Sequence, residues 1–131
     1  MKKALIFRGG WDGHEPGPVS ERFSEMLRKN GWDVRISDSL DALADAEYLK
    51  TLDLIVPCWT MGELPSDYCR NVCDAVANGT GLAGCHGGMC DAFRESTDWQ
   101  FMTGGQWVSH PGGDGVKYTV NIIKSSDAIV D

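Results

Sequence analysis

Apolar and polar residues follow one another along the chain in blocks that predict strands and helices in turn. Two short runs are almost wholly apolar and stop at glycine or proline, as strands buried on both faces do. Between the strands, apolar residues recur at helical spacing from Pro18 and again from Pro65, and each stretch ends in Asn-Gly, a left-handed stop signal. The predicted strands cover residues 3–8, 33–36, 52–57 and 81–85.

The remaining segments have weaker patterns. Ser39 to Leu49 predicts one or two helical turns, capped by Ser39 or Asp41. Beyond Met89 we expect one helix, an irregular stretch, and an alternating strand at Lys117 to Ile123. Strands that alternate with helices imply right-handed crossovers, so the sequence predicts an α/β three-layer domain with a mostly parallel sheet.

Composition narrows the class of protein further. A chain of 131 residues with 42% hydrophobic side chains is long enough for a single domain, residues 1–131. The net charge of -7, without any basic cluster, argues against nucleic acid and an anionic membrane as partners. No apolar run has the length of a signal-peptide core or a membrane span, and the five cysteines suit free thiols in a cytoplasmic protein.

Unusual side chains cluster on the loops that leave the predicted strands. These loops carry two of the three histidines, His14 and His86, together with Trp11 and Trp59. Ligands of parallel sheets bind beyond the carboxyl ends of the strands, where these loops meet. A glycine pair often only ends a strand, and a loop tryptophan often only covers a small core. Because histidine is scarce in this chain, two histidines at one edge of the sheet favour a functional site. The third histidine, His110, could fold back over the same place.

The segment Gly84-Cys85-His86-Gly87-Gly88 predicts a tight turn from strand to helix. This is the geometry of a nucleophile elbow, which holds one residue above the sheet while the helix N-terminus offers backbone N–H groups. His86 stands at the apex. Strand alternation predicts that Cys85 points into the sheet packing. Cys69 and Cys73, spaced i, i+4 on an apolar helix face, are expected in the core.

Three segments of the chain carry a resemblance to a known family. They are residues 9–15 (GGWDGHE), 84–93 (GCHGGMCDAF) and 104–111 (GGQWVSHP). With them the chain resembles the ThuA-like proteins, named for trehalose utilisation, of the class I glutamine amidotransferase-like superfamily. The resemblance implies a flavodoxin-like fold and a role in carbohydrate metabolism.

The chain also departs from this superfamily. Amidotransferases have an elbow of the form Gly-x-Cys-x-Gly, and matching Gly84 and Gly88 to its glycines puts His86 in the place of the cysteine. The chain beyond His110 contains neither histidine nor glutamate, so cysteine-dependent glutamine hydrolysis is not expected. ThuA-like proteins are commonly longer, and the ending at residues 125–131 suggests a C-terminal truncation.

The favoured hypothesis is a protein that binds a sugar-like small molecule, as an enzyme or former enzyme. Tryptophan faces can stack on a sugar ring, carboxylates can accept hydrogen bonds from hydroxyls, and His86 or His14 can act as general base near neutral pH. The predicted substrate-binding residues are Trp11, Asp12, Glu15, Trp59, Gly87, Gly88, Asp91 and Trp107.

Two alternatives remain open. His14, His86 and His110, with Glu15, could hold a divalent transition metal such as zinc in a metal-dependent hydrolase, although their spacing matches no metal motif. The chain could instead be a non-catalytic sugar-sensing or partner-binding module. Convergence of the three histidines would favour chemistry, and their separation would favour binding. Edge strands and exposed tryptophans would also suit a homodimer.

Overall fold

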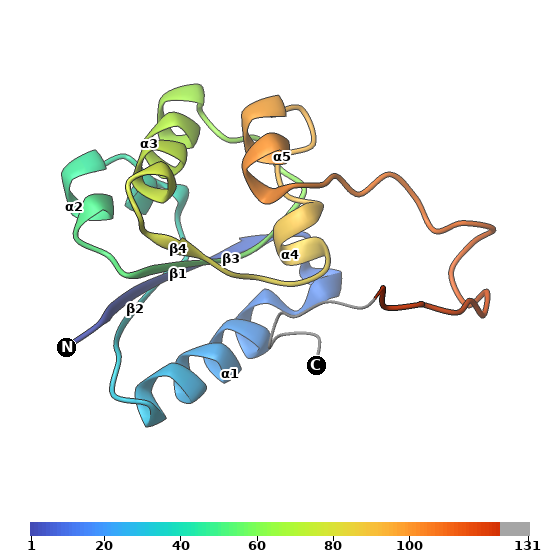
Figure 1. Ribbon diagram of the computed structural model, residues 1–131, viewed down its shortest axis with the longest axis horizontal. Coiled ribbons are helices and arrows are strands. Elements are labelled where there is room, and N and C mark those ends of the chain that lie inside the picture. Colours follow the sequence, from blue (N-terminus) through green and yellow to red (C-terminus); the bar gives the residue numbers. More distant parts are fainter. Residues whose placement is uncertain (124–131) are drawn as a thin grey trace.

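The computed structural model describes residues 1–123. Within this range four parallel strands form one sheet in the order β2-β1-β3-β4 (Figure 1). This is the strand order of flavodoxin-like folds, so the predicted α/β fold and parallel sheet are confirmed. The strands are β1 (Lys3–Gly10), β2 (Asp33–Ser37), β3 (Leu54–Thr60) and β4 (Gly81–Leu82).

The helices lie on both faces of this sheet, which gives three layers. In Figure 1, α1 lies below the sheet, whereas α2, α3 and α5 lie above it and α4 sits near the ends of the strands. None of the helices in residues 1–123 combines the length and the apolar character that crossing a bilayer requires. The helical elements are η1 (Asp12–His14), α1 (Pro16–Lys29), η2 (Leu40–Leu43), α2 (Ala46–Lys50), α3 (Ser66–Ala77), α4 (Gly87–Cys90) and α5 (Thr97–Thr103).

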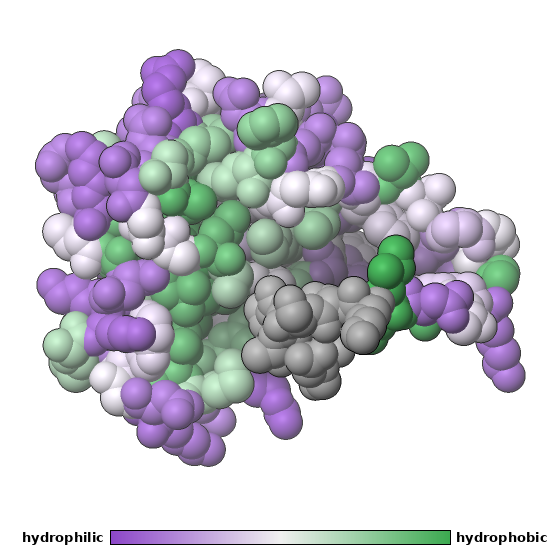
Figure 2. Space-filling view, in the orientation of Figure 1, coloured by the Kyte–Doolittle hydropathy of each residue, from purple (hydrophilic) through white to green (hydrophobic). Residues whose placement is uncertain are grey.

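The two central strands have a buried side-chain face on each side, as their apolar sequences predict. Leu5 and Phe7 of β1 face the larger core, which α3 and α5 complete with Val72 and Trp99. Alternate residues such as Ile6 face the smaller core, which lies between the sheet and α1. In the space-filling view, hydrophobic residues gather in a band between α1 and the helices above the sheet (Figure 2).

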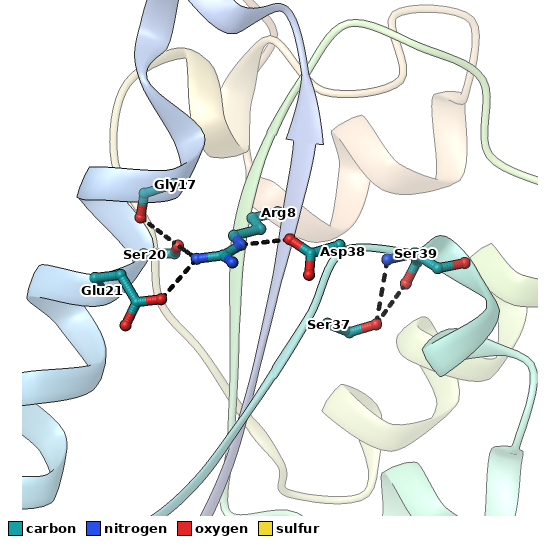
Figure 3. A network of polar contacts seen from close by, with 7 residues as sticks. All are labelled: Arg8, Gly17, Ser20, Glu21, Ser37, Asp38 and Ser39. Atoms are coloured by element: carbon teal, nitrogen blue, oxygen red, sulfur yellow. Dashed lines mark hydrogen bonds and ion pairs between the residues drawn. The ribbon is translucent and has the colours of Figure 1, made fainter.

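A polar network joins three elements at the carboxyl end of β1 (Figure 3). Arg8 donates hydrogen bonds to Ser20 and Glu21 of α1 at 3.0 and 2.9 Å, and to Asp38 after β2 at 2.6 Å. Both carboxylates raise the pKa of Arg8 through these hydrogen bonds, the one to Asp38 most strongly. The network ties α1 and β2 to the strand end from which the first loop leaves.

Several predicted boundaries differ from the structure. α1 begins at Pro16 rather than Pro18, because proline is well tolerated in the first turn of a helix. The expected turns after residue 38 are η2, capped by the Ser39 hydroxyl, and the short helix α2, capped by Asp45. Beyond Met89 the structure has α5 as well as the end of α4.

Two strand predictions were too long or wrong. The predicted strand 81–85 pairs with β3 only at Gly81 and Leu82, because the chain then turns toward the elbow. Lys117 to Ile123 is not a strand: it has no sheet partner among residues 1–123, and Tyr118, Val120 and Ile122 are exposed. An alternating pattern needs a neighbouring strand before it can form a ladder. Residues 125–131, where the sequence suggested a truncation, lie outside the described residues.

Candidate functional site

The site lies where the strand order reverses, between the carboxyl ends of β1 and β3. Helices leave these two strands toward opposite faces of the sheet, which opens a crevice between them. After β1 the chain makes the 3-10 turn η1, which ends with His14. β3 ends at Thr60, and Gly10 lies so close to this residue that a Cβ there would be 2.0 Å from the Thr60 carbonyl oxygen.

His14 is held by contacts on several sides. Its Nδ1 lies 2.9 Å from the hydroxyl oxygen of buried Thr60. The imidazole also covers Gly87, where a Cβ would come within 2.3 Å of the His14 Cε1. The indole of Trp11 packs edge-on against the imidazole, with ring centroids 4.7 Å apart. The sequence thus positions this histidine through one hydroxyl, one glycine and one tryptophan.

His86 has the strained backbone of an elbow residue. Its φ of 52° and ψ of -141° are rarely adopted by residues with a side chain, and such strain costs about 1–3 kcal/mol. α4 follows at once, and the Cys90 N–H donates to the His86 carbonyl oxygen at 2.9 Å. The imidazole of His86 is exposed and lies edge-on to that of His14, with ring centroids 4.9 Å apart. The elbow therefore brings the two histidines into contact.

Backbone hydrogen bonds join the residue after β3 to the chain that follows α4. The Met61 N–H donates to the Asp91 carbonyl oxygen at 2.7 Å, and the Phe93 N–H donates to the Met61 carbonyl oxygen at 3.2 Å. The carboxylate of Asp91 is buried and accepts two hydrogen bonds from Arg94. Those hydrogen bonds raise the pKa of Arg94. The guanidinium is therefore a fixed cation at the rim.

Two cavities meet at the histidine pair. The larger, of about 300 Å³, is mixed in character and the smaller, of about 130 Å³, is mostly apolar. His14 and His86 line both, so the two cavities adjoin at these residues. The larger cavity is lined by Trp11, His14, Met61, His86, Gly87, Asp91, Arg94, Trp107, Ser109 and His110. The smaller is lined by His14, Pro16, Val19, Phe23, Pro57, Cys58, Thr60, Cys85, His86 and Gly88.

Most of the residues predicted from sequence meet at these cavities, but some do not. Trp59 lines neither: its indole packs over Gly9 and Gly62 and beside Phe93. Asp12 and Glu15 are exposed on and after η1, and they line neither cavity. The predicted site residues that line a cavity are Trp11, His14, His86, Gly87, Gly88, Asp91, Trp107 and His110.

The third histidine lies beyond a tryptophan ring. The Trp107 indole is 6.4 Å from His86 and 4.6 Å from His110 by ring centroids. Residues 1–123 contain no group of three His, Cys, Asp or Glu side chains so placed that they could hold a metal ion. The three-histidine zinc site proposed from the sequence is therefore not assembled in this arrangement.

The prediction for Cys85 was wrong. This thiol is exposed, because β4 ends at Leu82 and Cys85 no longer follows strand alternation. Cys58 on β3 is buried instead, and burial raises its pKa to about 11. All five cysteines are free thiols, as expected, with Cys69 in the core and Cys73 partly buried beside it.

Sequence reasoning missed Thr60, Met61, Arg94 and Ser109 as cavity residues. Thr60 carried one usable signal, because it is a polar residue at the end of an apolar strand. Arg94 follows Asp91 by three residues, a spacing that allows an ion pair within one helical turn. Nothing in the sequence placed either residue beside a histidine.

Comparison with known proteins identifies the family of this chain. A family model described as ThuA, trehalose utilisation, matches residues 3–131. Searches of curated proteins and of solved structures gave no match. The matched range includes both histidine loops, the elbow and the whole sheet. The chain therefore belongs to the ThuA trehalose utilisation family.

Proposed function

We propose that this protein binds a sugar or a sugar-derived small molecule in the larger cavity. One observation carries the proposal: the strained elbow holds His86 against His14 at the sheet edge, over a cavity that Trp11 and Trp107 also line. Indole faces suit the apolar faces of a sugar ring, while imidazole nitrogens and Ser109 can bind its hydroxyls. Family membership supports a role in trehalose utilisation.

We further propose that the histidine pair performs acid–base chemistry on the bound molecule. In this reading His86 takes the place of the amidotransferase cysteine and moves protons instead of forming a covalent bond. An imidazole can accept or donate a proton near neutral pH. Its exposed position at the apex leaves it accessible to a ligand.

Calorimetric titration with trehalose, glucose and their keto derivatives tests binding. Trp107→Ala should weaken the affinity for the best of these ligands about 3- to 10-fold, because it removes one stacking face. Trp32→Ala is the matched control, since Trp32 is also partly buried but packs against the smaller core under the Lys2 ammonium, just before β2 at the amino ends of the strands and away from the elbow. Absence of binding for every ligand, or an equal loss in both variants, would contradict the proposal.

The alternative of a non-catalytic sensing module has its own test. Proton NMR of the best ligand, incubated with protein over hours, reports any chemical change. Wild-type protein should convert the ligand, and His86→Gln should bind it with little change in affinity but convert it at least 100-fold more slowly. Binding without conversion by the wild type would favour the sensing module.

A further inference from the structure

The hydroxyl of Thr60 lies within hydrogen-bond distance of one ring nitrogen of His14. Thr60 is 1% exposed, and its Oγ1 lies 2.9 Å from His14 Nδ1. Within residues 1–123 this is the only hydrogen-bond partner found for that hydroxyl. Thr60 borders the smaller cavity but is almost fully buried, so the acceptor that the described chain offers to the hydroxyl hydrogen is His14 Nδ1.

The two tautomers of neutral His14 differ in how they satisfy this hydroxyl. If Nδ1 carried the proton it would donate to Oγ1, and the buried hydroxyl hydrogen would be left without an acceptor. If Nδ1 carries a lone pair it accepts the Thr60 O–H, and both groups are satisfied. An unpaired buried donor is strongly disfavoured, by about tenfold or more in population. The second arrangement therefore dominates.

We propose that Thr60 is a positioning residue that holds neutral His14 as the Nε2–H tautomer, so that His14 offers the ligand a hydrogen-bond donor. Gly87 and Trp11 hold the same ring in place from two other sides. No protein hydrogen bond of this kind constrains His86 within the described chain, so His86 is left as the base. This division of roles rests on the proposed function, whereas the tautomer itself does not.

The sequence alone contains no trace of this assignment. Thr60 and His14 are 46 positions apart, and they meet because β1 and β3 are adjacent in register, with Gly10 opposite Thr60. The register places the hydroxyl at the strand end where η1 turns back over the sheet. Any threonine one residue earlier would project to the opposite face.

Long-range proton–nitrogen NMR on ¹⁵N-labelled protein tests the assignment without any ligand. At a pH where the imidazole is neutral, His14 should show a protonated Nε2 and an unprotonated Nδ1 in a ratio of about ten to one or more. A protonated Nδ1 in the wild type would overturn the proposal. Because the readout is spectroscopic, failure of every sugar to bind would remove the proposed function and leave this result standing.

Two substitutions at one position complete the test. Thr60→Val replaces the hydroxyl by a methyl group of similar size and should lower the tautomer ratio several-fold. Thr60→Ser keeps the hydroxyl and should restore the wild-type spectrum. An unchanged ratio in Thr60→Val would overturn the proposal, because a role in packing alone predicts no change in the tautomer. The wild-type measurement decides the case if Thr60→Val does not fold.

Discussion

The two walls of the histidine site are built in different ways. The β1/β3 wall consists of Trp11, His14, Cys58 and Thr60, and the β4 wall consists of Cys85, His86, Trp107 and His110. In the first, Cys58 and Thr60 are at most 5% exposed and the imidazole is fixed by a hydroxyl and a glycine. In the second, the thiol and both imidazoles are exposed.

The difference follows from how each wall is anchored. Central strands buried on both faces carry the β1/β3 wall, so packing orders Cys58 and Thr60 before any ligand arrives, although Trp11 is half exposed. In the β4 wall, Trp107 is anchored by its backbone N–H, which donates to the Cys90 carbonyl oxygen at 2.8 Å. We therefore expect substitutions of buried side chains around the site to affect stability, and substitutions of the exposed side chains of the β4 wall to affect mainly affinity or reactivity.

The largest effect is expected where the core supports the elbow. Trp99 is 1% exposed, packs against Phe93 and Phe7, and donates its indole N–H to the carbonyl oxygen of Met89 in α4 at 3.0 Å. Trp99→Ala should lower the free energy of unfolding by about 3–5 kcal/mol, measured by urea denaturation.

The control for this variant lies on the same helix. Phe101 is 92% exposed, so Phe101→Ala should change the unfolding free energy by no more than about 0.5 kcal/mol. Similar losses in the two variants would mean that α5 does not support the elbow through its buried face.

The next expected effect is a difference in thiol reactivity between Cys58 in the β1/β3 wall and Cys85 in the β4 wall. Burial raises the pKa of Cys58 to about 11, so at pH 8 this group stays a protonated thiol with about 1000-fold less thiolate than thiol. Cys85 is exposed, and iodoacetamide should alkylate it at least about 10-fold faster than Cys58, as followed by peptide mass spectrometry. Equal rates in folded protein would show that the β1/β3 wall opens to solvent.

A smaller effect is expected where the walls meet. A Cβ at Gly87 would lie 2.3 Å from His14 Cε1, so Gly87→Ala should displace this imidazole and cost about 1–3 kcal/mol of stability by overpacking. The tautomer ratio of His14 should also fall, as measured by the same NMR experiment.

Gly88→Ala is the matched control, because the nearest atom to its added Cβ is the Cys58 Cα at 3.4 Å, close to ordinary contact. It should leave the His14 spectrum unchanged. A wild-type spectrum in Gly87→Ala would show that the glycine does not hold the histidine in place.

The sequence predicted the location of the site better than it predicted which residues line it. The apolar runs located β1 and β3, and glycines after each predicted strand located the elbow, because these signals arise from neighbours in the chain. Trp59 was expected at the site because it follows the predicted strand 52–57, yet it lies within β3 and its ring turns away over Gly9 and Gly62. A side chain's direction at a strand end depends on which glycines leave room for it.

The sequence by itself determined the family, the alternation of strands and helices, and the elbow with His86 at its apex, because local periodicity and short motifs encode these features. Only the tertiary structure decided that Thr60 lies against His14, that Cys85 is exposed, and that His110 stands beyond Trp107. It also left Lys117 to Ile123 without a sheet partner in the described part of the chain. These outcomes depend on strand register and on which elements pack together, and residues distant in the chain settle both.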